Sequence, residues 1–331
     1  MIKNITVIGD GGWGTTLAII LNKKGYKIKL WSAFKDYAGY LNKKRVNTKF
    51  LAGVKIPKVI LITNSLKEAV LDADLIILAV PSQYLRSVLI KLKIYNEPNK
   101  IFLSVVKGIE TTTLKRMSEV VYDVLGKVKL AVLSGPTIAY EVVRSIPTTA
   151  VVASKDTRLA KEIQDILITD RFRVYTNNDV IGVELGGSLK NVIAIACGFS
   201  DGLRFGTNTK AAILARGLAE ITRLGVVLGA DSKTFSGISG LGDLVTTCIS
   251  PFSRNRFVGE QIGRGRKLKD ILRDMEMVAE GVPTAKSAYF LSRKCKVDMP
   301  IIAEIYLVLY KNKSPIKAVD DLMSRRRKSE F

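Results

Sequence analysis

Short apolar runs recur along the first half of the chain, with segments of helical spacing between them. The runs cover residues 5–8, 27–31, 59–62, 75–80, 101–104, 130–133 and 150–153. Segments 83–92 and 113–125 between them show the helical spacing. Run 75–80 is continuous rather than alternating, which is typical of a strand covered on both faces. This half is therefore predicted to form an α/β structure around a doubly wound, mainly parallel sheet.

A glycine-rich turn joins the first predicted strand to an apolar helix. Gly9, Gly11 and Gly14 follow strand 5–8 with the spacing G-x-G-x-x-G, and segment 15–21 is helix-like. Without side chains, backbone N–H groups at a helix N-terminus can approach a pyrophosphate. Strand, turn and helix in this order predict a Rossmann-type dinucleotide site.

The pattern changes to helical periodicity beyond about residue 178. The predicted helices cover residues 180–199, 210–228, 267–274 and 285–294. We therefore predict a dinucleotide-binding domain of residues 1–178 and an all-helical C-terminal domain of residues 179–331. The substrate of such an enzyme is expected in the cleft between the domains, beside the carboxyl ends of the strands.

Charge and composition narrow the classes of partner and chemistry. The 331-residue chain has a net charge of +22 and no histidine. A basic surface attracts phosphorylated metabolites as well as nucleic acid. However, aromatic residues do not alternate with basic ones, and the dense run 325–328 is predicted to be a solvated tail. We expect no nucleic-acid partner, and any proton transfer must use groups other than imidazole.

Cysteine spacing and apolar runs exclude further classes. Cys197, Cys248 and Cys295 are widely spaced, which predicts buried thiols and neither a disulfide framework nor a metal site. No apolar run approaches the roughly 18 residues that span a bilayer. Residues 1–4 lead directly into a strand rather than a cleavable signal. A cytoplasmic protein with no stable membrane insertion is expected.

Lys190 is a candidate for acid–base chemistry. It follows Gly186 and Gly187 within the helix-like segment 184–196. Two glycines disfavour a helix by roughly 1 kcal/mol each relative to alanine, which the close approach of a ligand or another helix would explain. The Lys190 side chain leans back over them, so the glycines are expected to open a slot for it. A solvated lysine is the alternative.

Three further segments carry polar groups that suit the same site. Lys107 follows strand 101–104, Asp243 lies in a glycine-rich turn before a helix, and segment 253–256 combines guanidinium, amide and hydroxyl donors. Such a fork of donors matches a phosphate. A helix N-cap is the alternative for Asp243, and arginines in ion pairs are the alternative for the loop.

Together these motifs resemble the NAD(P)-dependent glycerol-3-phosphate dehydrogenases over essentially the whole chain. The matching stretches are 9–18, 80–83, 107–108, 133–139, 184–196, 240–243, 253–256 and 280–281. The resemblance implies reversible hydride transfer between NAD(P)H and the phosphorylated triose dihydroxyacetone phosphate. The product would be sn-glycerol 3-phosphate for glycerophospholipid synthesis. A homodimer is also an expectation from the family.

The resemblance also implies roles for individual residues. Lys190 matches the family's catalytic lysine, which exchanges a proton with the substrate oxygen, Lys107 matches the second active-site lysine, and Asp243 would orient Lys190. The implied substrate-binding residues are Lys107, Gly135, Thr137, Lys190, Asn191, Asp243, Ser253, Arg254 and Asn255. The implied cofactor-binding residues are Gly9, Gly11, Gly12, Trp13, Gly14, Ser32, Lys107, Ala139, Arg254, Val278 and Glu280. Gly12 and Thr137 stand where many relatives carry serine.

The choice between NAD and NADP stays open at this point. Segment 31–34 after the second strand lacks the acidic residue that binds a ribose 2′-hydroxyl. It also lacks the arginine that many relatives place near a 2′-phosphate. Ser32 and Lys35 favour NADP.

Two other functions are compatible with parts of the sequence. One is a related dehydrogenase of a β-hydroxyacid or sugar acid, whose carboxylate would take the place of the phosphate. The other is a nucleotide-sensing regulator that binds nucleic acid through its basic surface. A sensor has no need for Lys107, Lys190 and Asp243 near the nucleotide, and no nucleic-acid recognition motif is visible.

Overall fold

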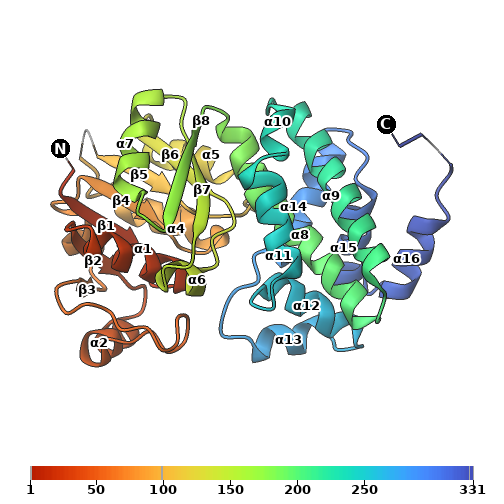
Figure 1. Cartoon of the computed structure of the whole chain (residues 1–331), viewed down its shortest axis with the longest axis horizontal. Coiled ribbons are helices and arrows are strands. Elements are labelled where there is room, and N and C mark those ends of the chain that lie inside the picture. The colour runs from red at the N-terminus through yellow and green to blue at the C-terminus, as the bar shows by residue number, and fades with distance from the viewer. Residues whose placement is uncertain (1, 98–99, 328, 331) are drawn as a thin grey trace.

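An eight-stranded sheet with flanking helices forms the N-terminal half, and helices alone follow it in the part of the chain described here (Figure 1). The structure is a computed structural model and describes residues 2–97, 100–327 and 329–330. The strands are β1 Asn4–Ile8, β2 Lys27–Trp31, β3 Leu61–Thr63, β4 Leu75–Leu78, β5 Ile101–Ser104, β6 Lys129–Ser134, β7 Thr148–Ala153 and β8 Phe172–Asn177. This arrangement confirms the predicted fold class.

Helices connect the strands of the sheet, and a second group of helices, which includes the two longest, α8 and α9, builds the C-terminal half. The first group is α1 Gly12–Lys23, α2 Lys35–Lys44, α3 Leu66–Val70, the 3₁₀-helix η1 Ser82–Tyr84, α4 Leu85–Lys93, α5 Met117–Leu125, α6 Ala139–Val143 and α7 Thr157–Leu167. The second group is α8 Val180–Gly202, α9 Thr207–Val227, α10 Ser232–Phe235, the π-helix η2 Ile238–Gly242, α11 Asp243–Ile249, α12 Arg254–Gly263, α13 Leu268–Asp274, α14 Gly281–Lys294, α15 Pro300–Lys311 and α16 Pro315–Met323.

The strand order is β3-β2-β1-β4-β5-β6-β7-β8, and neighbouring strands are parallel except for the antiparallel pair β6 and β7. The order reverses between β1 and β4, where a doubly wound sheet binds ligands at the carboxyl ends of its strands. Strand β8 was not predicted because it contains no continuous apolar run: buried Phe172 and Val174 alternate with exposed Arg173 and Tyr175. The predicted run 59–62 becomes a strand only from Leu61 onward.

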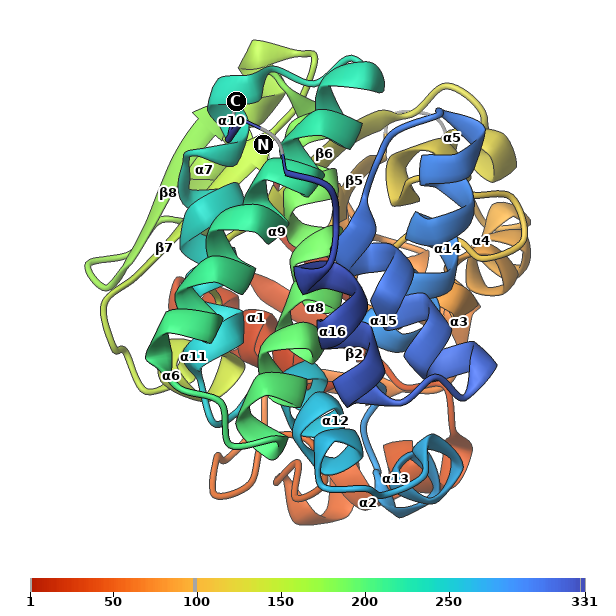
Figure 2. The same ribbon diagram turned by 90° about the vertical axis from the view of Figure 1, so that its right-hand side faces the viewer.

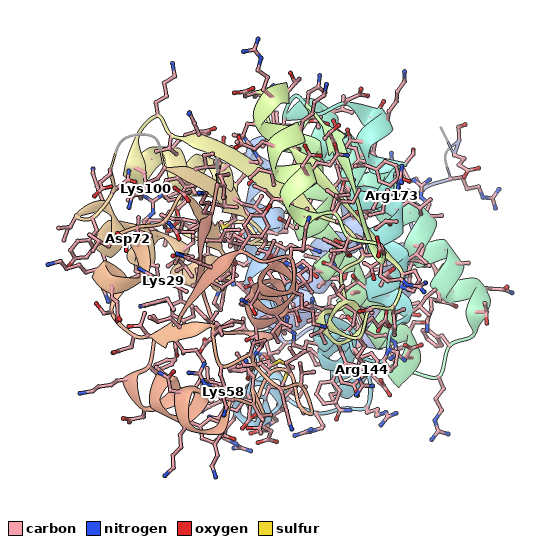
Figure 3. All side chains as sticks on the ribbon, turned by 60° about the vertical axis from the view of Figure 1, so that its left-hand side comes forward. Lys29, Lys58, Asp72, Lys100, Arg144 and Arg173 are labelled. Carbon is pink, nitrogen blue, oxygen red and sulfur yellow. The ribbon has the colours of Figure 1, made fainter. Side chains whose placement is uncertain are left out.

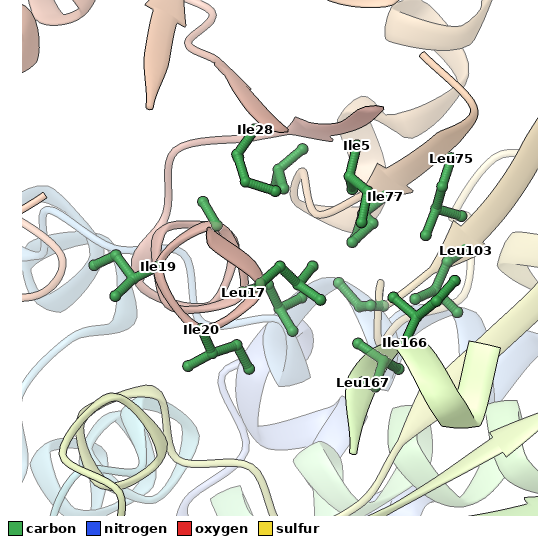
Figure 4. Packing of buried hydrophobic residues seen from close by; sticks show 14 of the residues in the cluster. Ile5, Leu17, Ile19, Ile20, Ile28, Leu75, Ile77, Leu103, Ile166 and Leu167 are labelled. Atoms are coloured by element: carbon green, nitrogen blue, oxygen red, sulfur yellow. The ribbon is translucent and has the colours of Figure 1, made fainter. Parts of the chain in front are cut away.

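Helix α1 covers one face of the sheet and fixes the glycine-rich turn in place. Leu17 of α1 and Ile5, Ile77 and Leu103 of three strands are buried in one apolar cluster, which also includes Ile166 of α7 (Figure 4). Burial of such side chains stabilises the fold by about 1.5–3 kcal/mol each. The glycine turn is therefore anchored by the packing of the elements on both sides of it.

Helix α8 runs through the middle of the C-terminal half, with α9, α12 and α15 around it (Figure 2). It has 23 residues and is long and apolar enough to cross a bilayer, contrary to the sequence-based expectation that no such stretch exists. Small and polar residues interrupt its apolar residues, so it does not stand out as an uninterrupted run. In the protein, 89% of its most apolar 18-residue window is buried, which makes it the core helix of this half.

The thiols agree only in part with the prediction, whereas the described residues of the basic tail agree with it. Cys197 and Cys248 are buried as predicted, whereas Cys295 is half-buried because it follows the last turn of α14. Arg325, Arg326 and Arg327 are exposed, as predicted for a solvated tail; Arg325 also forms a surface ion pair with Asp298 at 2.7 Å, and Lys328 lies outside the described residues.

Basic side chains are spread over the surface rather than gathered in one recognition groove. Figure 3 shows Lys29, Lys58, Arg144 and Arg173 at separate places on the N-terminal half. Several of these cations have intramolecular partners; for example, the Arg144 guanidinium lies 3.7 Å from the centre of the Tyr140 ring.

Candidate active site

Two lysines from different halves of the molecule share one buried carboxylate. Lys107 Nζ lies 2.7 Å from Oδ2 of Asp243, and Lys190 Nζ lies 2.7 Å from Oδ1. Lys107 follows β5, Lys190 lies on α8, and Asp243 is the first residue of α11. Asp243 is only 1% exposed, so the two ion pairs are shielded from water. The three residues that the sequence singled out separately therefore meet in one cluster.

The Asp243 side chain does not cap its helix, which removes the alternative raised from the sequence. Helix α11 continues directly from the π-helix η2, and Gly242 at the junction has a helical conformation. The carboxylate is thus left for the lysines. Thr247, one turn later, accepts a hydrogen bond from Lys190 at 2.5 Å. Sequence reasoning missed Thr247, although its spacing of four from Asp243 places both on one helix face.

The surroundings of Lys190 change its acid–base character. Burial lowers the pKa of Lys190 to about 8, the Asp243 carboxylate opposes this shift, and the positive charge of Lys107 adds to it. A lysine with a pKa near neutrality can exchange protons at physiological pH.

Gly186 and Gly187 do not form a slot for Lys190, which corrects the sequence-based expectation. A Cβ at Gly186 would lie 2.7 Å from the carbonyl oxygen of Ser239. A Cβ at Gly187 would lie 2.2 Å from Ser134 Oγ and 3.7 Å from Cδ of Lys107. The glycines therefore admit η2 and β6 to the helix surface, which brings Asp243 and Lys107 within reach of Lys190.

Lys107 is held by the loop after β6. Its ammonium group donates to the carbonyl of Gly135 at 2.8 Å, and Thr137 Oγ1 lies 3.5 Å away. Gly135 has φ +136°, a backbone conformation that side chains strongly disfavour. The two implied substrate residues of this loop, Gly135 and Thr137, thus border the lysine cluster.

The N-terminus of α12 carries the predicted phosphate-binding residues. Ser253 is the N-cap, and its Oγ accepts from the N–H of Arg256. Arg256 itself pairs with Asp201 at 2.6 Å and is a structural arginine, as the alternative reading of this loop proposed. Arg254 as a whole is an exposed residue, but its guanidinium is desolvated, which lowers its pKa, and it forms no ion pair within the described residues. Its guanidinium is therefore available to an anion.

Asn191 and Asn255 form a relay between α8 and α12. Asn255 Nδ2 donates to Asn191 Oδ1 at 2.8 Å, and Asn255 Oδ1 accepts from the N–H of Gly281 at 2.8 Å. Both amides are buried. Asn255 thus fixes the Asn191 side chain through one of its amide hydrogens. Because Asn191 is adjacent to Lys190 on α8, this bond holds the start of α12 beside Lys190.

The glycine-rich turn fits a dinucleotide pyrophosphate. A Cβ at Gly14 would lie 2.0 Å from the carbonyl oxygen of Gly9, so the turn closes only with glycine at this position. Nothing lies within 4 Å of the place of a Cβ at Gly11, and the first turn of α1 has no side-chain cap. Free N–H groups beside open space at a helix N-terminus favour an anion. At Gly12 a Cβ would meet the carbonyl oxygen of Phe50 at 2.5 Å, so a serine there would require that loop to move.

The other implied cofactor residues lie around this turn and at the start of α14. The Trp13 ring meets Phe172 edge-on at 6.3 Å, and the carbonyl of Ala139 accepts from Thr16. Ser32 is fully buried at the end of β2, whereas Val278 is exposed.

Glu280 makes a contact that the sequence did not indicate. Its two carboxylate oxygens accept hydrogen bonds from the N–H and hydroxyl of Ser82, at 2.9 and 2.5 Å. Glu280 lies just before α14, and Ser82 follows β4. This carboxylate therefore joins the two halves close to the carboxyl end of β4.

The comparisons with known proteins agree with this geometry. Residues 4–160 match the N-terminal model of the NAD-dependent glycerol-3-phosphate dehydrogenases, and residues 179–320 match the C-terminal one. An NAD(P)+ glycerol-3-phosphate dehydrogenase of Thermoanaerobacter is 51% identical over 99% of this chain and 98% of its own length. One from Chlorobium limicola is 48% identical over 99% of both chains. The crystal structure of glycerol-3-phosphate dehydrogenase from Coxiella burnetii superposes with a TM-score of 0.95 at 36% identity, covering 98% of this chain and 99% of that one.

Proposed function

Because this chain belongs to the NAD-dependent glycerol-3-phosphate dehydrogenase family, we propose that its cluster of Lys107, Lys190 and Asp243 interconverts dihydroxyacetone phosphate and sn-glycerol 3-phosphate. The chain is an NAD(P)-dependent oxidoreductase of the type classified as EC 1.1.1.94. The single observation that carries the assignment of roles is the pair of ammonium groups on one buried carboxylate.

The bound nicotinamide supplies or accepts the hydride, and the residues of this chain manage the charge and the proton on oxygen. In the reducing direction the carbonyl oxygen gains negative charge, which the ammonium groups of Lys190 and Lys107 stabilise. Lys190 then gives its proton to that oxygen and returns to the neutral form that its lowered pKa allows. In the oxidising direction neutral Lys190 accepts the hydroxyl proton. Asp243 keeps both lysines in place throughout and does not itself exchange the proton.

The phosphate of the substrate is assigned to the start of α12. Arg254 supplies a planar fork of donors, and Ser253 and Asn255 flank it on the same first turn. Binding energy from this non-reacting group fixes the ketone against the lysine cluster. Asn191, held by Asn255, borders the substrate on the α8 side.

The cofactor is assigned to the N-terminal half. Gly11, Gly12 and Trp13 would hold the pyrophosphate at the start of α1, and Ala139, Arg254, Val278 and Glu280 would border the nicotinamide end. We accordingly divide the chain into a cofactor domain of residues 1–178 and a catalytic domain of residues 179–331. The sheet ends at Asn177 and α8 begins at Val180, which supports this boundary.

Three broader assignments accompany the activity. We propose a cytoplasmic enzyme that acts as a homodimer, as the family resemblance implies, and that supplies sn-glycerol 3-phosphate for glycerophospholipid synthesis. The proposal includes no nucleic-acid partner and no membrane insertion. The burial of α8 in the protein core supports a structural role for this helix rather than a membrane-spanning one.

The direct test is an assay of the purified chain by nicotinamide absorbance. Dihydroxyacetone phosphate is expected to be reduced with at least one of NADH and NADPH, and the product to be the sn-glycerol 3-phosphate enantiomer. A panel of β-ketoacids and sugar acids serves as the comparison. Turnover confined to those acids would replace the proposal with the related hydroxyacid activity. Salt-sensitive duplex binding without any turnover would favour a regulatory protein instead.

A further inference from the structure

Asp10 places a carboxylate inside the glycine-rich turn, between Gly9 and Gly11. Its Oδ2 accepts a hydrogen bond from Ser32 Oγ at 2.6 Å. Ser32 is the first residue after β2 and is fully buried. The Asp10 carboxylate therefore stands at the carboxyl end of β2, although it belongs to the turn after β1.

In dinucleotide-binding folds an acidic residue about 20 positions beyond the glycine motif, at the end of β2, hydrogen-bonds the 2′-hydroxyl of the adenosine ribose. Ser32, 22 positions after Asp10, occupies that place and cannot supply a carboxylate. We propose that Asp10 supplies this carboxylate from the β1–α1 turn, and that the chain therefore binds NAD(H) in preference to NADP(H). The inference rests on the proposed function and selects between its two cofactors.

The hydrogen bonding of Ser32 argues against its use as a donor to a 2′-phosphate. A hydroxyl has one proton to give, and Ser32 directs it to Asp10 at 2.6 Å, with the carbonyl of Phe34 as a weaker acceptor at 3.4 Å. The Ser32 side chain is fully buried, so bulk water does not compete with Asp10 for this proton. This removes one of the two features from which the sequence favoured NADP.

The Asp10 carboxylate is held in position by its backbone. The Asp10 carbonyl accepts from Asn47 Nδ2 at 2.7 Å and from Thr15 Oγ1 at 3.1 Å. Within the described residues no hydrogen bond uses Oδ1 of Asp10. This second oxygen is thus available to accept from a ribose hydroxyl without displacing Ser32.

The charges around this position also favour the unphosphorylated ribose. A 2′-phosphate beside Asp10 would meet a fixed, partly buried carboxylate, whereas Lys35, the cation that the sequence offered for a 2′-phosphate, is exposed at the start of α2. An exposed lysine contributes little because water screens it and its side chain must be ordered, so the nearby carboxylate dominates. Lys49 is directed to the Tyr37 ring, 5.3 Å from its centre.

The test compares dissociation constants, not activity. NADH and NADPH are titrated into the wild-type protein and followed by tryptophan fluorescence, and 5′-ADP and 2′,5′-ADP are compared by calorimetry. We expect the wild-type protein to bind NADH at least about tenfold more tightly than NADPH, which corresponds to a free-energy difference of about 1.4 kcal/mol. Asp10→Ala should reduce that ratio by about tenfold or more, mainly by strengthening NADPH binding. Asp36→Ala, which removes an exposed carboxylate from α2, should leave the ratio unchanged.

Three binding results would each overturn the inference, and a fourth result comes from turnover. The binding results are wild-type protein that binds NADPH as tightly as NADH, an Asp10→Ala ratio equal to that of wild type, or 2′,5′-ADP binding that matches 5′-ADP. Asp10→Asn provides a second variant of nearly identical shape in case Asp10→Ala does not fold. Equal reduction of dihydroxyacetone phosphate with both nucleotides would contradict the preference and leave the proposed function intact. Absence of turnover with either nucleotide would contradict the proposed function instead.

Discussion

The ammonium group of Lys190 lies 2.7 Å from Oδ1 of Asp243, although the two residues are 53 positions apart in the chain and lie on different helices. Lys107 binds the other carboxylate oxygen from the opposite half of the molecule. A single buried carboxylate cannot fully neutralise two ammonium groups, so the cluster retains positive charge. In the proposed reaction, this positive charge would stabilise the negative charge that develops on the substrate oxygen.

The pH dependence of the two directions should be opposite. Reduction requires protonated Lys190, so kcat/KM for dihydroxyacetone phosphate is expected to fall as pH rises through about 8, the pKa of this lysine. Oxidation requires neutral Lys190, so kcat/KM for sn-glycerol 3-phosphate should rise through the same pH. Parallel profiles for both directions would separate Lys190 from the proton transfer.

Replacing Asp243 should move that transition toward lower pH. The carboxylate raises the pKa of Lys190 against the effects of burial and of Lys107, so Asp243→Asn removes the largest opposing influence. We expect kcat/KM for reduction to drop by at least about tenfold at pH 7 and its alkaline limb to move below 8. Circular dichroism confirms the fold of the variant. A variant with an unchanged pH profile would contradict the shared-carboxylate arrangement.

Much of the sheet was readable from the sequence because its strands are short, apolar and buried. Run 101–104 became β5 with the predicted limits, and the glycine spacing located the first turn. Strand β8 was not predicted because it lies at an edge of the sheet, where exposed residues alternate with buried ones and leave no continuous apolar run. Helices α15 and α16 were also missed, although prolines at their first turns marked their N-termini.

The site was predictable as a set of residues but not as a set of contacts. Lys107, Lys190 and Asp243 each stood in a recognisable motif, whereas their shared carboxylate depends on how η2 packs against Gly186. The bond between Ser82 and Glu280 spans 198 positions, and no local pattern predicts such a pairing. The role of Asp10 was hidden for the same reason, because its partner Ser32 belongs to another strand.

Arg254→Ala should weaken substrate binding much more than cofactor binding. The Arg254 guanidinium at the start of α12 is assigned to the substrate phosphate, and loss of a charge-assisted pair costs about 2–5 kcal/mol. We expect KM for dihydroxyacetone phosphate to rise by at least about thirtyfold. The dissociation constant of the preferred nucleotide, measured by fluorescence, should change by less than about threefold. Arg264→Ala, which removes an exposed arginine of the same region, is the control. Equal losses for substrate and nucleotide would contradict the assignment of the phosphate to Arg254 and leave this residue only its place beside the cofactor or a structural role.

Glu220 should make the stability of the protein depend on pH. Its buried carboxylate accepts from the N–H groups of Ile301 and Ile302, and burial raises its pKa from 4.5 to about 7. A raised pKa in the folded state contributes stability that is complete below pH 4.5 and is lost as pH rises through about 7. The shift corresponds to about 3 kcal/mol.

The measurement for Glu220 is urea unfolding of wild type and Glu220→Gln between pH 5 and 8. The difference in unfolding free energy should move in favour of the variant as pH rises, because glutamine has no charge to bury. Glu162→Gln on the exposed face of α7 should show no such trend. A constant difference across the pH range would mean that Glu220 titrates near its ordinary pKa.

The most direct measurement of the central claim is single-turnover hydride transfer by Lys190→Ala, followed by nicotinamide absorbance at saturating substrate and cofactor. The account predicts a rate at least about a thousandfold below wild type, within the range that general acid–base catalysis contributes, and a nucleotide dissociation constant within about threefold of wild type. Lys286→Ala on the exposed face of α14 should retain the wild-type rate. A Lys190→Ala variant that reduces dihydroxyacetone phosphate at the wild-type rate would contradict the account.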